Sequence, residues 1–346
     1  MGRRGRFARL PHQRVARART RGRPLGFVRR QAGRKVRRVL PRSPVRRCRT
    51  RFHARDPDPN RPEKMSDKTD LSLLWDFGDP VTSESRFRGA LDTPEAQADP
   101  AFRVEVLTQI ARALGLQSKL EEARSVLDEA AELLPPESSA SAWVEIERGR
   151  IENSSGNPQE ARQHFLEAWA GARRRGQEAL AIDAAHMIAI VSDEAESLAW
   201  NQKALELASE SADPKARRWT ASLLNNIGWT HHSAGRFSEA LVAFERALEA
   251  RLAQGQAEPT RIAKWCVARC LRSLGRVEEA LARLRDIEGQ ADDGFVDEEI
   301  GECLWTLGRR EESRAHFTQA FDKLSKVPGL AQNEPERLQS LRDRAG

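Results

Sequence analysis

The chain lacks tyrosine, and only 3 of its 346 residues are methionine and only 4 are cysteine. Its longest uninterrupted apolar runs, such as Met187–Val191, are five residues long, far short of the roughly 20 residues that a membrane-spanning helix needs. The N-terminus does not show the succession of basic, apolar and small residues that marks a secretory signal. We therefore expect neither a transmembrane helix nor a secretory signal.

The four cysteines are too few and too irregularly spaced for a disulfide framework. They are Cys48, Cys266, Cys270 and Cys303, and no C-x2-C pair occurs among them. Cys266 and Cys270 do not form a convincing metal-binding set with any histidine. We expect reduced, buried thiols that pack as small apolar residues. Such thiols are typical of a cytoplasmic protein.

Motifs of common catalytic sites are also missing. The sequence has no H-E-x-x-H, G-x-S-x-G, P-loop or G-x-G-x-x-G motif. Neighbouring acidic residues such as Glu121-Glu122 stand where helices are expected to begin, and there they favour the helix dipole. His231, in the only histidine pair, falls at an apolar position of the pattern described below. We therefore predict a protein that is not an enzyme and that has no cofactor and no bound metal.

Acidic residues are almost absent from the first 64 residues. This segment holds 23 Lys and Arg but only 3 Asp and Glu, a net charge of +20, whereas residues 65–346 hold 35 basic and 48 acidic residues, a net charge of −13. The overall charge of +7 is thus an average of two unlike parts. Arguments for nucleic-acid binding from the overall charge therefore do not apply to residues 65–346.

Residues 1–64 have scattered apolar residues without a sustained period, so we do not expect them to form a core. Three interpretations stay open. The segment is a disordered basic tail that binds nucleic acid or an acidic partner, an organelle-targeting segment, or upstream sequence that is not native protein. The third interpretation rests on Met65, where the composition changes abruptly and Met-Ser-Asp-Lys-Thr-Asp makes a plausible natural start.

The clearest pattern is Leu223–Ala250, LLNNIGWTHHSAGRFSEALVAFERALEA. Two apolar-periodic segments of helical length flank a short turn at Gly235, a residue that adopts left-handed conformations easily. Gly228 and Ala240 are small where two antiparallel helices must approach closely, and Phe244 fills the space beyond. The spacing resembles the tetratricopeptide repeat (TPR), whose pattern is W-x2-L-G-x2-Y followed by A-x3-F.

Six copies of this pattern recur at intervals near one repeat length. They start near Val104, Ala142, Glu178, Ala221, Arg261 and Gly294. The third copy is the weakest, because it lacks a turn glycine at Ser192-Asp193 and has Asn201 where an aromatic residue is usual. Trp200, beside Asn201, is expected to supply the missing bulk.

The resemblance implies an all-α, right-handed superhelical solenoid of about six helix-turn-helix repeats. We predict a basic segment at 1–64, a leading segment at 65–99 with a short helix beginning at Thr82 or Ser83, the repeat array at 100–327, and a C-terminal capping helix at 328–346. Such a cap covers the last repeat, which has no following neighbour.

A TPR solenoid also implies a concave groove, lined by the first helix of each pair, that binds a segment of a partner protein. First-helix positions not used against the second helix are the candidate partner-binding residues, and several are Trp or Arg, which often carry binding energy. They are Trp143, Arg150, Asn153, His186, Asn225, Trp229, His232, Trp265, Arg269, Arg272 and Trp305. We expect a non-catalytic scaffold or adaptor for a protein or peptide. The alternatives are a peptide- or ligand-responsive regulatory sensor and nucleic-acid association through residues 1–64.

Overall fold

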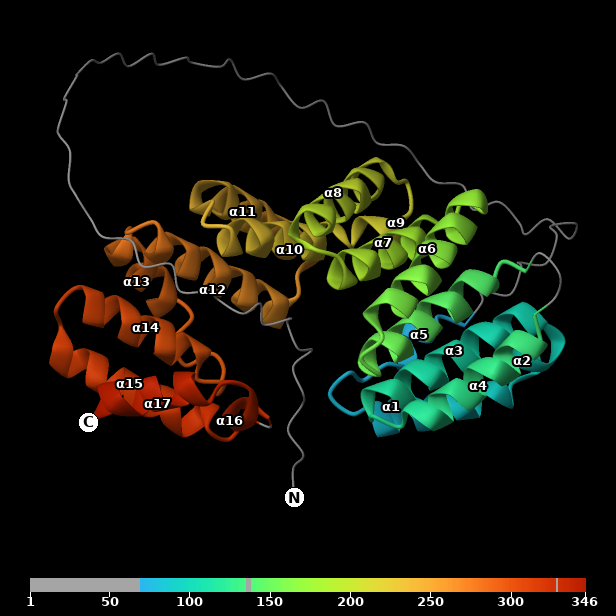
Figure 1. Cartoon of the computed structure of the whole chain (residues 1–346), viewed down its shortest axis with the longest axis horizontal. Helices are drawn as coiled ribbons and strands as arrows, with labels where there is room; N and C mark the ends of the chain where they lie inside the picture. Colours follow the sequence, from blue (N-terminus) through green and yellow to red (C-terminus); the bar gives the residue numbers. More distant parts are fainter. Residues whose placement is uncertain (1–68, 135–137, 328) are drawn as a thin grey trace, which may run out of the picture. The chain divides into compact units, whose positions relative to one another are not determined.

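Six antiparallel helix pairs follow one another along the chain (Figure 1). The computed structural model describes residues 69–134, 138–327 and 329–346. The pairs are α3 (Pro100–Leu116) with α4 (Leu120–Glu132), α5 (Ser141–Ser154) with α6 (Pro158–Arg174), α7 (Glu178–Val191) with α8 (Glu194–Glu210), α10 (Thr220–Ser233) with α11 (Phe237–Gln254), α12 (Ala257–Ser273) with α13 (Val277–Arg285), and α14 (Phe295–Thr306) with α15 (Arg310–Leu324). The six copies expected from the sequence are confirmed. The interpretations of residues 1–64, with Cys48, concern residues outside the described ranges.

Short elements precede, interrupt and follow the pairs. They are the 3-10 helix η1 (Leu71–Leu74), α1 (Pro80–Leu91), α2 (Pro94–Ala98), α9 (Pro214–Arg217), α16 (Leu330–Asn333) and α17 (Pro335–Ala345). α17 packs against α15, as expected of a cap. The first helix begins earlier than Thr82, because Asp79 caps it through Thr82 N and Pro80 takes the first helical position.

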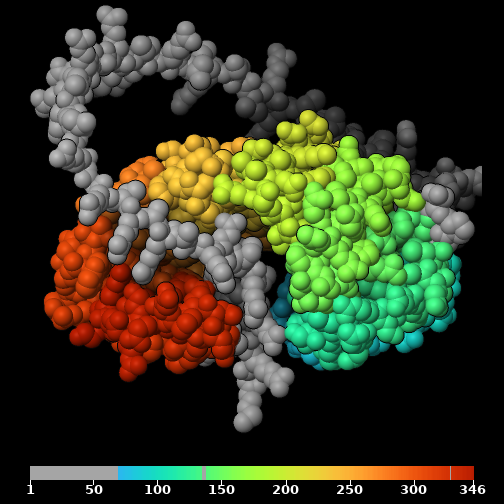
Figure 2. Space-filling model, viewed as in Figure 1, coloured from blue at the N-terminus to red at the C-terminus, as the bar shows by residue number. Residues whose placement is uncertain are grey.

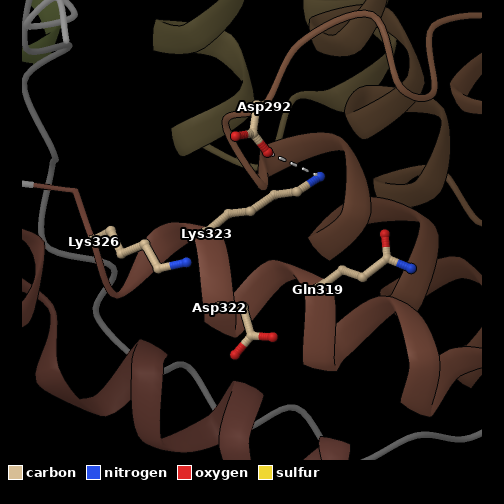
Figure 3. A pocket seen from close by; sticks show the side chains of 5 residues that line it. All are labelled: Asp292, Gln319, Asp322, Lys323 and Lys326. Carbon is tan, nitrogen blue, oxygen red and sulfur yellow. Dashed lines mark ion pairs between the residues drawn. The ribbon is translucent and has the colours of Figure 1, made fainter. Parts of the chain in front are cut away.

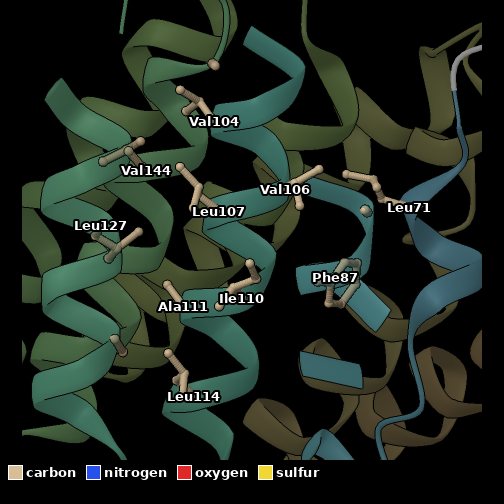
Figure 4. Packing of buried hydrophobic residues seen from close by; sticks show 14 of the residues in the cluster. Leu71, Phe87, Val104, Val106, Leu107, Ile110, Ala111, Leu114, Leu127 and Val144 are labelled. Atoms are coloured by element: carbon tan, nitrogen blue, oxygen red, sulfur yellow. The ribbon is translucent and has the colours of Figure 1, made fainter. Parts of the chain in front are cut away.

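α3 forms the centre of the first hydrophobic cluster. Figure 4 shows its apolar side chains between Leu127 and Val144 on one side and Phe87 of α1 on the other. Leu71, in the leading segment, joins the same cluster, so this residue packs against the first repeat. Trp75 adds a hydrogen bond from its Nε1 to Gln109 Oε1 at 3.0 Å.

Five of the six pairs combine a small residue on the first helix with a larger apolar residue opposite it on the second. A Cβ at Gly149, Gly228 or Gly301 would lie 2.4, 2.6 or 2.8 Å from the nearest ring atom of the phenylalanine opposite. Those rings, of Phe165, Phe244 and Phe317, are fully buried. At the equivalent positions the first and fifth copies pair Ala111 with Leu127 and Ala268 with Leu284. A larger residue on one helix thus goes with a smaller one on the other.

The turns within the pairs use different residues for the same task. Glycines in the left-handed region occupy four of them, for example Gly235 with φ 75°. Ser118 takes this conformation in the first copy, with φ 63°. The third copy turns through extended Ser192, and the Asp193 side chain caps α8 by accepting from Glu196 N. This explains why that copy needs no turn glycine.

The third copy keeps its helix pair despite Asn201. The Asn201 side chain is buried and donates to Ser197 O at 2.9 Å, while Trp200 packs against the cluster that contains Phe165 and Ile188. Every repeat also packs on the next, so each colour band in Figure 2 touches the following one. None of the helices that the structure describes is both long and apolar enough to cross a membrane.

Candidate partner-binding surface

All eleven residues predicted for partner binding lie on first helices, namely α5, α7, α10, α12 and α14. We call them together the first-helix face. Each is half-buried. Several of them make polar contacts to the first helix of the next repeat. These contacts connect adjacent first helices along the first-helix face.

Arg150 of α5 lies in a charged cluster between three first helices. Its guanidinium pairs with Glu147 on its own helix and with both carboxylate oxygens of Asp183 on α7, each at 2.7 Å. Burial alone would raise the pKa of Asp183, but the neighbouring positive charges, chiefly Arg150 and Arg112, together hold the pKa below its usual value. Arg112 of α3 adds a second positive charge and has its guanidinium 5.6 Å from the Trp75 ring centroid.

The next contact along the face joins α7 to α10. His186 Nδ1 and Asn226 Nδ2 are 3.0 Å apart, so the neutral imidazole accepts from the amide. The His186 ring also packs against Trp219, with centroids 5.4 Å apart. Burial lowers the pKa of His186, which keeps this acceptor uncharged near neutral pH.

Similar polar contacts connect α10 to α12 and α12 to α14. Cys266 Sγ donates to Asn225 Oδ1 at 3.4 Å, and His232 Nε2 lies 2.9 Å from Ser273 Oγ. Arg269 and Arg272 both pair with Glu299 of α14, the latter through Nε at 2.7 Å. Glu299 is fully buried beneath the two guanidinium groups.

Aromatic rings form a row beside these charges. The Trp229 and Trp265 centroids are 6.0 Å apart, and Phe295 follows 6.3 Å from Trp265. Trp265 Nε1 donates to Phe295 O at 3.1 Å. Trp229 Nε1 is buried without a hydrogen-bond partner among the described residues.

The remaining predicted residues lie at the two ends of the face. Trp143 packs on the cluster formed by α5, α6 and α7. Asn153 lies near the end of α5. Trp305 lies under the Arg310 guanidinium, 3.5 Å from the ring centroid, and beside Arg344 of α17. The structure brings Trp229, His232, Trp265, Arg269 and Arg272 together, and it leaves Trp143, Asn153 and Trp305 apart from them.

Sequence reasoning missed the acidic partners on the same face. Asp183 stands 33 residues after Arg150, and Glu299 stands 30 after Arg269. These intervals are close to one repeat, which brings first-helix positions of adjacent repeats opposite one another. Opposite charges one repeat apart were therefore a usable signal.

The three described cysteines are free and buried. Burial raises the pKa of Cys266 and Cys303 to about 12 and that of Cys270 to about 11. At neutral pH they are thiols, and the thiol is the unreactive form. Their packing role agrees with the expectation from the sequence.

The comparisons with known proteins agree with this architecture. Residues 177–253, which span α7 to α11, match the family model described as tetratricopeptide repeat. These residues therefore form tetratricopeptide repeats. No curated protein matches the sequence.

Solved structures with the same fold are distant in sequence. A STAND-type signal transduction ATPase with a TPR sensor from Pyrococcus horikoshii aligns with a TM-score of 0.58 at 13% identity, over 76% of this chain and 41% of that one. The APC/C hetero-tetramer Cut9-Hcn1 gives a TM-score of 0.52 at 13% identity, over 80% and 54%. A TPR protein from Parabacteroides merdae gives 0.46 at 14% identity, over 80% and 96%. The first two likenesses show the all-α TPR solenoid fold.

Proposed function

We propose that this TPR protein is a non-catalytic interaction scaffold whose first-helix face binds a partner segment that carries an acidic residue beside an apolar one. The binding centre is Trp229, Trp265, Arg269 and Arg272. The observation that carries the proposal is the surplus positive charge at the two arginines, next to half-buried tryptophan rings.

The charge surplus follows from the contacts. One carboxylate, Glu299, faces two guanidinium groups whose side chains are 32% and 23% exposed. Burial and the nearby Arg269 charge lower the pKa of His232 to about 4, so His232 is neutral at pH 7 and adds no positive charge. The pair of arginines therefore keeps about one positive charge that a carboxylate of the partner can share.

The aromatic row supplies the apolar part of the site. Trp229 and Trp265 belong to adjacent repeats, so a partner segment that contacts both must lie across the first helices. Tryptophan and arginine are enriched among the residues that dominate binding energy at interfaces. The ties between first helices hold these side chains in place before binding, which lowers the ordering cost of association.

A peptide-display selection against the purified chain tests the proposal. We expect enriched peptides to contain Asp or Glu next to a large apolar residue. Trp265→Ala and Arg269→Ala should each weaken the best peptide by about 1–3 kcal/mol, roughly 5- to 150-fold. Val242→Ala and Arg246→Ala, on the exposed face of α11, are the matched controls and should leave the affinity unchanged. Selection of basic peptides, or equal losses in the controls, would refute the proposal.

The regulatory-sensor alternative makes a different prediction. A sensor changes the dimensions of the array when the selected peptide binds, whereas a scaffold binds with little change. Small-angle X-ray scattering with and without saturating peptide separates the two. We also propose a cytoplasmic location, which the three free, buried cysteines support.

A further inference from the structure

Three side chains from separate parts of the last two repeats meet at one point. They are Glu288, in the turn after α13, Asp297, in the first turn of α14, and His316 of α15. One potential ligand atom from each lies within 4.8 Å of those of the other two. We propose that they form a binding site for a divalent transition-metal ion such as Zn²⁺.

The His316 side chain gives the first argument. It is 90% buried, yet its Nδ1 has no hydrogen-bond partner among the described residues. This atom faces Glu288 Oε1 at 3.8 Å and Asp297 Oδ1 at 3.9 Å. Both distances exceed the roughly 3.2 Å limit of a normal hydrogen bond, so a protonated imidazole would attract the two carboxylates only as a pair of long ionic contacts.

A metal ion accounts for these separations better than a proton does. Two ligand atoms about 2.1 Å from a tetrahedral ion are about 3.4 Å apart, so a small inward rotation of the side chains closes the site. One imidazole and two carboxylates form a donor set that zinc accepts, and water would take the fourth position. Glu288 is 32% exposed, which leaves an approach from solvent.

In both Glu288 and Asp297, the carboxylate oxygen that does not face His316 pairs with a basic side chain. Arg285 Nη1 lies 2.7 Å from Glu288 Oε2, and Lys323 Nζ lies 2.8 Å from Asp297 Oδ2. The opposite oxygens are therefore aimed at His316. Outer contacts of this kind orient ligands in protein metal sites.

The surroundings also fix the linker between the repeats. Lys323 pairs with Asp292 at 3.6 Å, and both side chains line a pocket of about 570 Å³ beside the cluster (Figure 3). Gly294 adopts φ 78°, and a Cβ there would lie 2.9 Å from Lys323 Cβ, so the linker lies close against α15. An ion at this point would join the end of the fifth repeat to both helices of the sixth.

From the sequence we expected no metal, because Cys266 and Cys270 form no convincing set with a histidine. A second cluster in the chain, Glu145, His164 and Glu167, provides the control. There His164 Nδ1 is already within hydrogen-bond distance of Glu145 Oε2, at 2.7 Å. It therefore lacks the unpartnered nitrogen that marks the proposed site.

The test is calorimetric titration of the untagged 346-residue chain with ZnCl₂ after treatment with EDTA. We expect one saturable ion per chain. Glu288→Gln should weaken the zinc affinity by more than the 10- to 100-fold that is typical of changes in outer contacts. His316→Ala should abolish zinc binding, and His164→Ala should leave the affinity unchanged. Because Glu288 lies in a partly exposed turn, its variant should fold even if His316→Ala does not; circular dichroism checks both.

Cobalt(II) then identifies the ligand type by its absorption spectrum. A spectrum without sulfur-to-metal charge transfer supports the site, whereas a thiolate signal would place the ion at cysteines and overturn the proposal. The absence of saturable zinc binding would overturn it too, and so would binding that Glu288→Gln does not affect.

Discussion

The size match between Gly228 and Phe244 makes the helix pair of the fourth repeat the sharpest place to perturb this fold. A Cβ at Gly228 would lie 2.6 Å from two atoms of the Phe244 ring, whereas carbon atoms in contact are about 3.5–4.0 Å apart. The ring is fully buried and would have to move by about 1 Å.

The single changes should both destabilise the protein. Overpacking by Gly228→Ala costs about 1–3 kcal/mol, offset by about 1 kcal/mol because alanine is the better helix former. Phe244→Leu loses buried contacts and costs about 1–2 kcal/mol. In the double variant the smaller leucine makes room for the methyl group, as Ala111–Leu127 and Ala268–Leu284 already do in other repeats. The double variant should therefore be more stable than the sum of the two losses by at least 1 kcal/mol.

A double-mutant cycle in urea measures this coupling. The equivalent cycle at Gly301 and Phe317 repeats the geometry and should give coupling of the same sign. The control cycle combines Gly89→Ala with Phe244→Leu. A Cβ at Gly89 would meet no atom within 4 Å, so the effects of these two substitutions on stability should be additive. Additivity within about 0.5 kcal/mol at Gly228 and Phe244 would refute the reasoning from ring contact.

Three further predictions concern single residues. Ser118→Gly should raise the free energy of unfolding by about 0.5–1 kcal/mol, because the left-handed conformation at φ 63° is strained for serine and not for glycine. Thermal unfolding checks this. Glu299→Gln should lower it by about 2–3 kcal/mol by leaving Arg269 and Arg272 without a full charge partner; an unchanged urea midpoint would contradict this. His232 has a folded-state pKa of about 4, below its unfolded value, so the stability it contributes is complete above pH 6.5 and is lost as the pH falls toward 4. Screening by solvent limits this loss to about 1–2 kcal/mol, and His232→Gln should remove that part of the pH dependence of urea unfolding.

The repeats were predictable because they are set by local pattern. The small residue at Gly228, the aromatic residue at Phe244 and the turn glycine at Gly235 act within one helix pair, so their spacing appears directly in the sequence. Even the irregular third helix pair could be predicted, because Trp200 supplies bulk close to the position of Asn201.

The interactions between repeats were harder to predict from the sequence. The sequence placed Arg150 and Arg269 on the first helices but did not show that Asp183 and Glu299 face them. Such pairs depend on the register between adjacent repeats, which varies with the inserted elements, such as α9. The Glu288, Asp297 and His316 cluster depends in addition on a linker whose path no motif encodes. The predicted start of α1, at Thr82 or Ser83, was two or three residues too late, because Asp79 caps the helix and Pro80 begins it.

The most direct test of the central claim is where a partner segment lies on the array. Hydrogen–deuterium exchange of the full chain, with and without the selected acidic peptide, locates the contact. We expect protection concentrated on α10 and α12, around Trp229 and Trp265, and its loss in Arg269→Ala. Protection confined to α11 and α13, the second helices of the same repeats, would show that the partner does not bind the first-helix face.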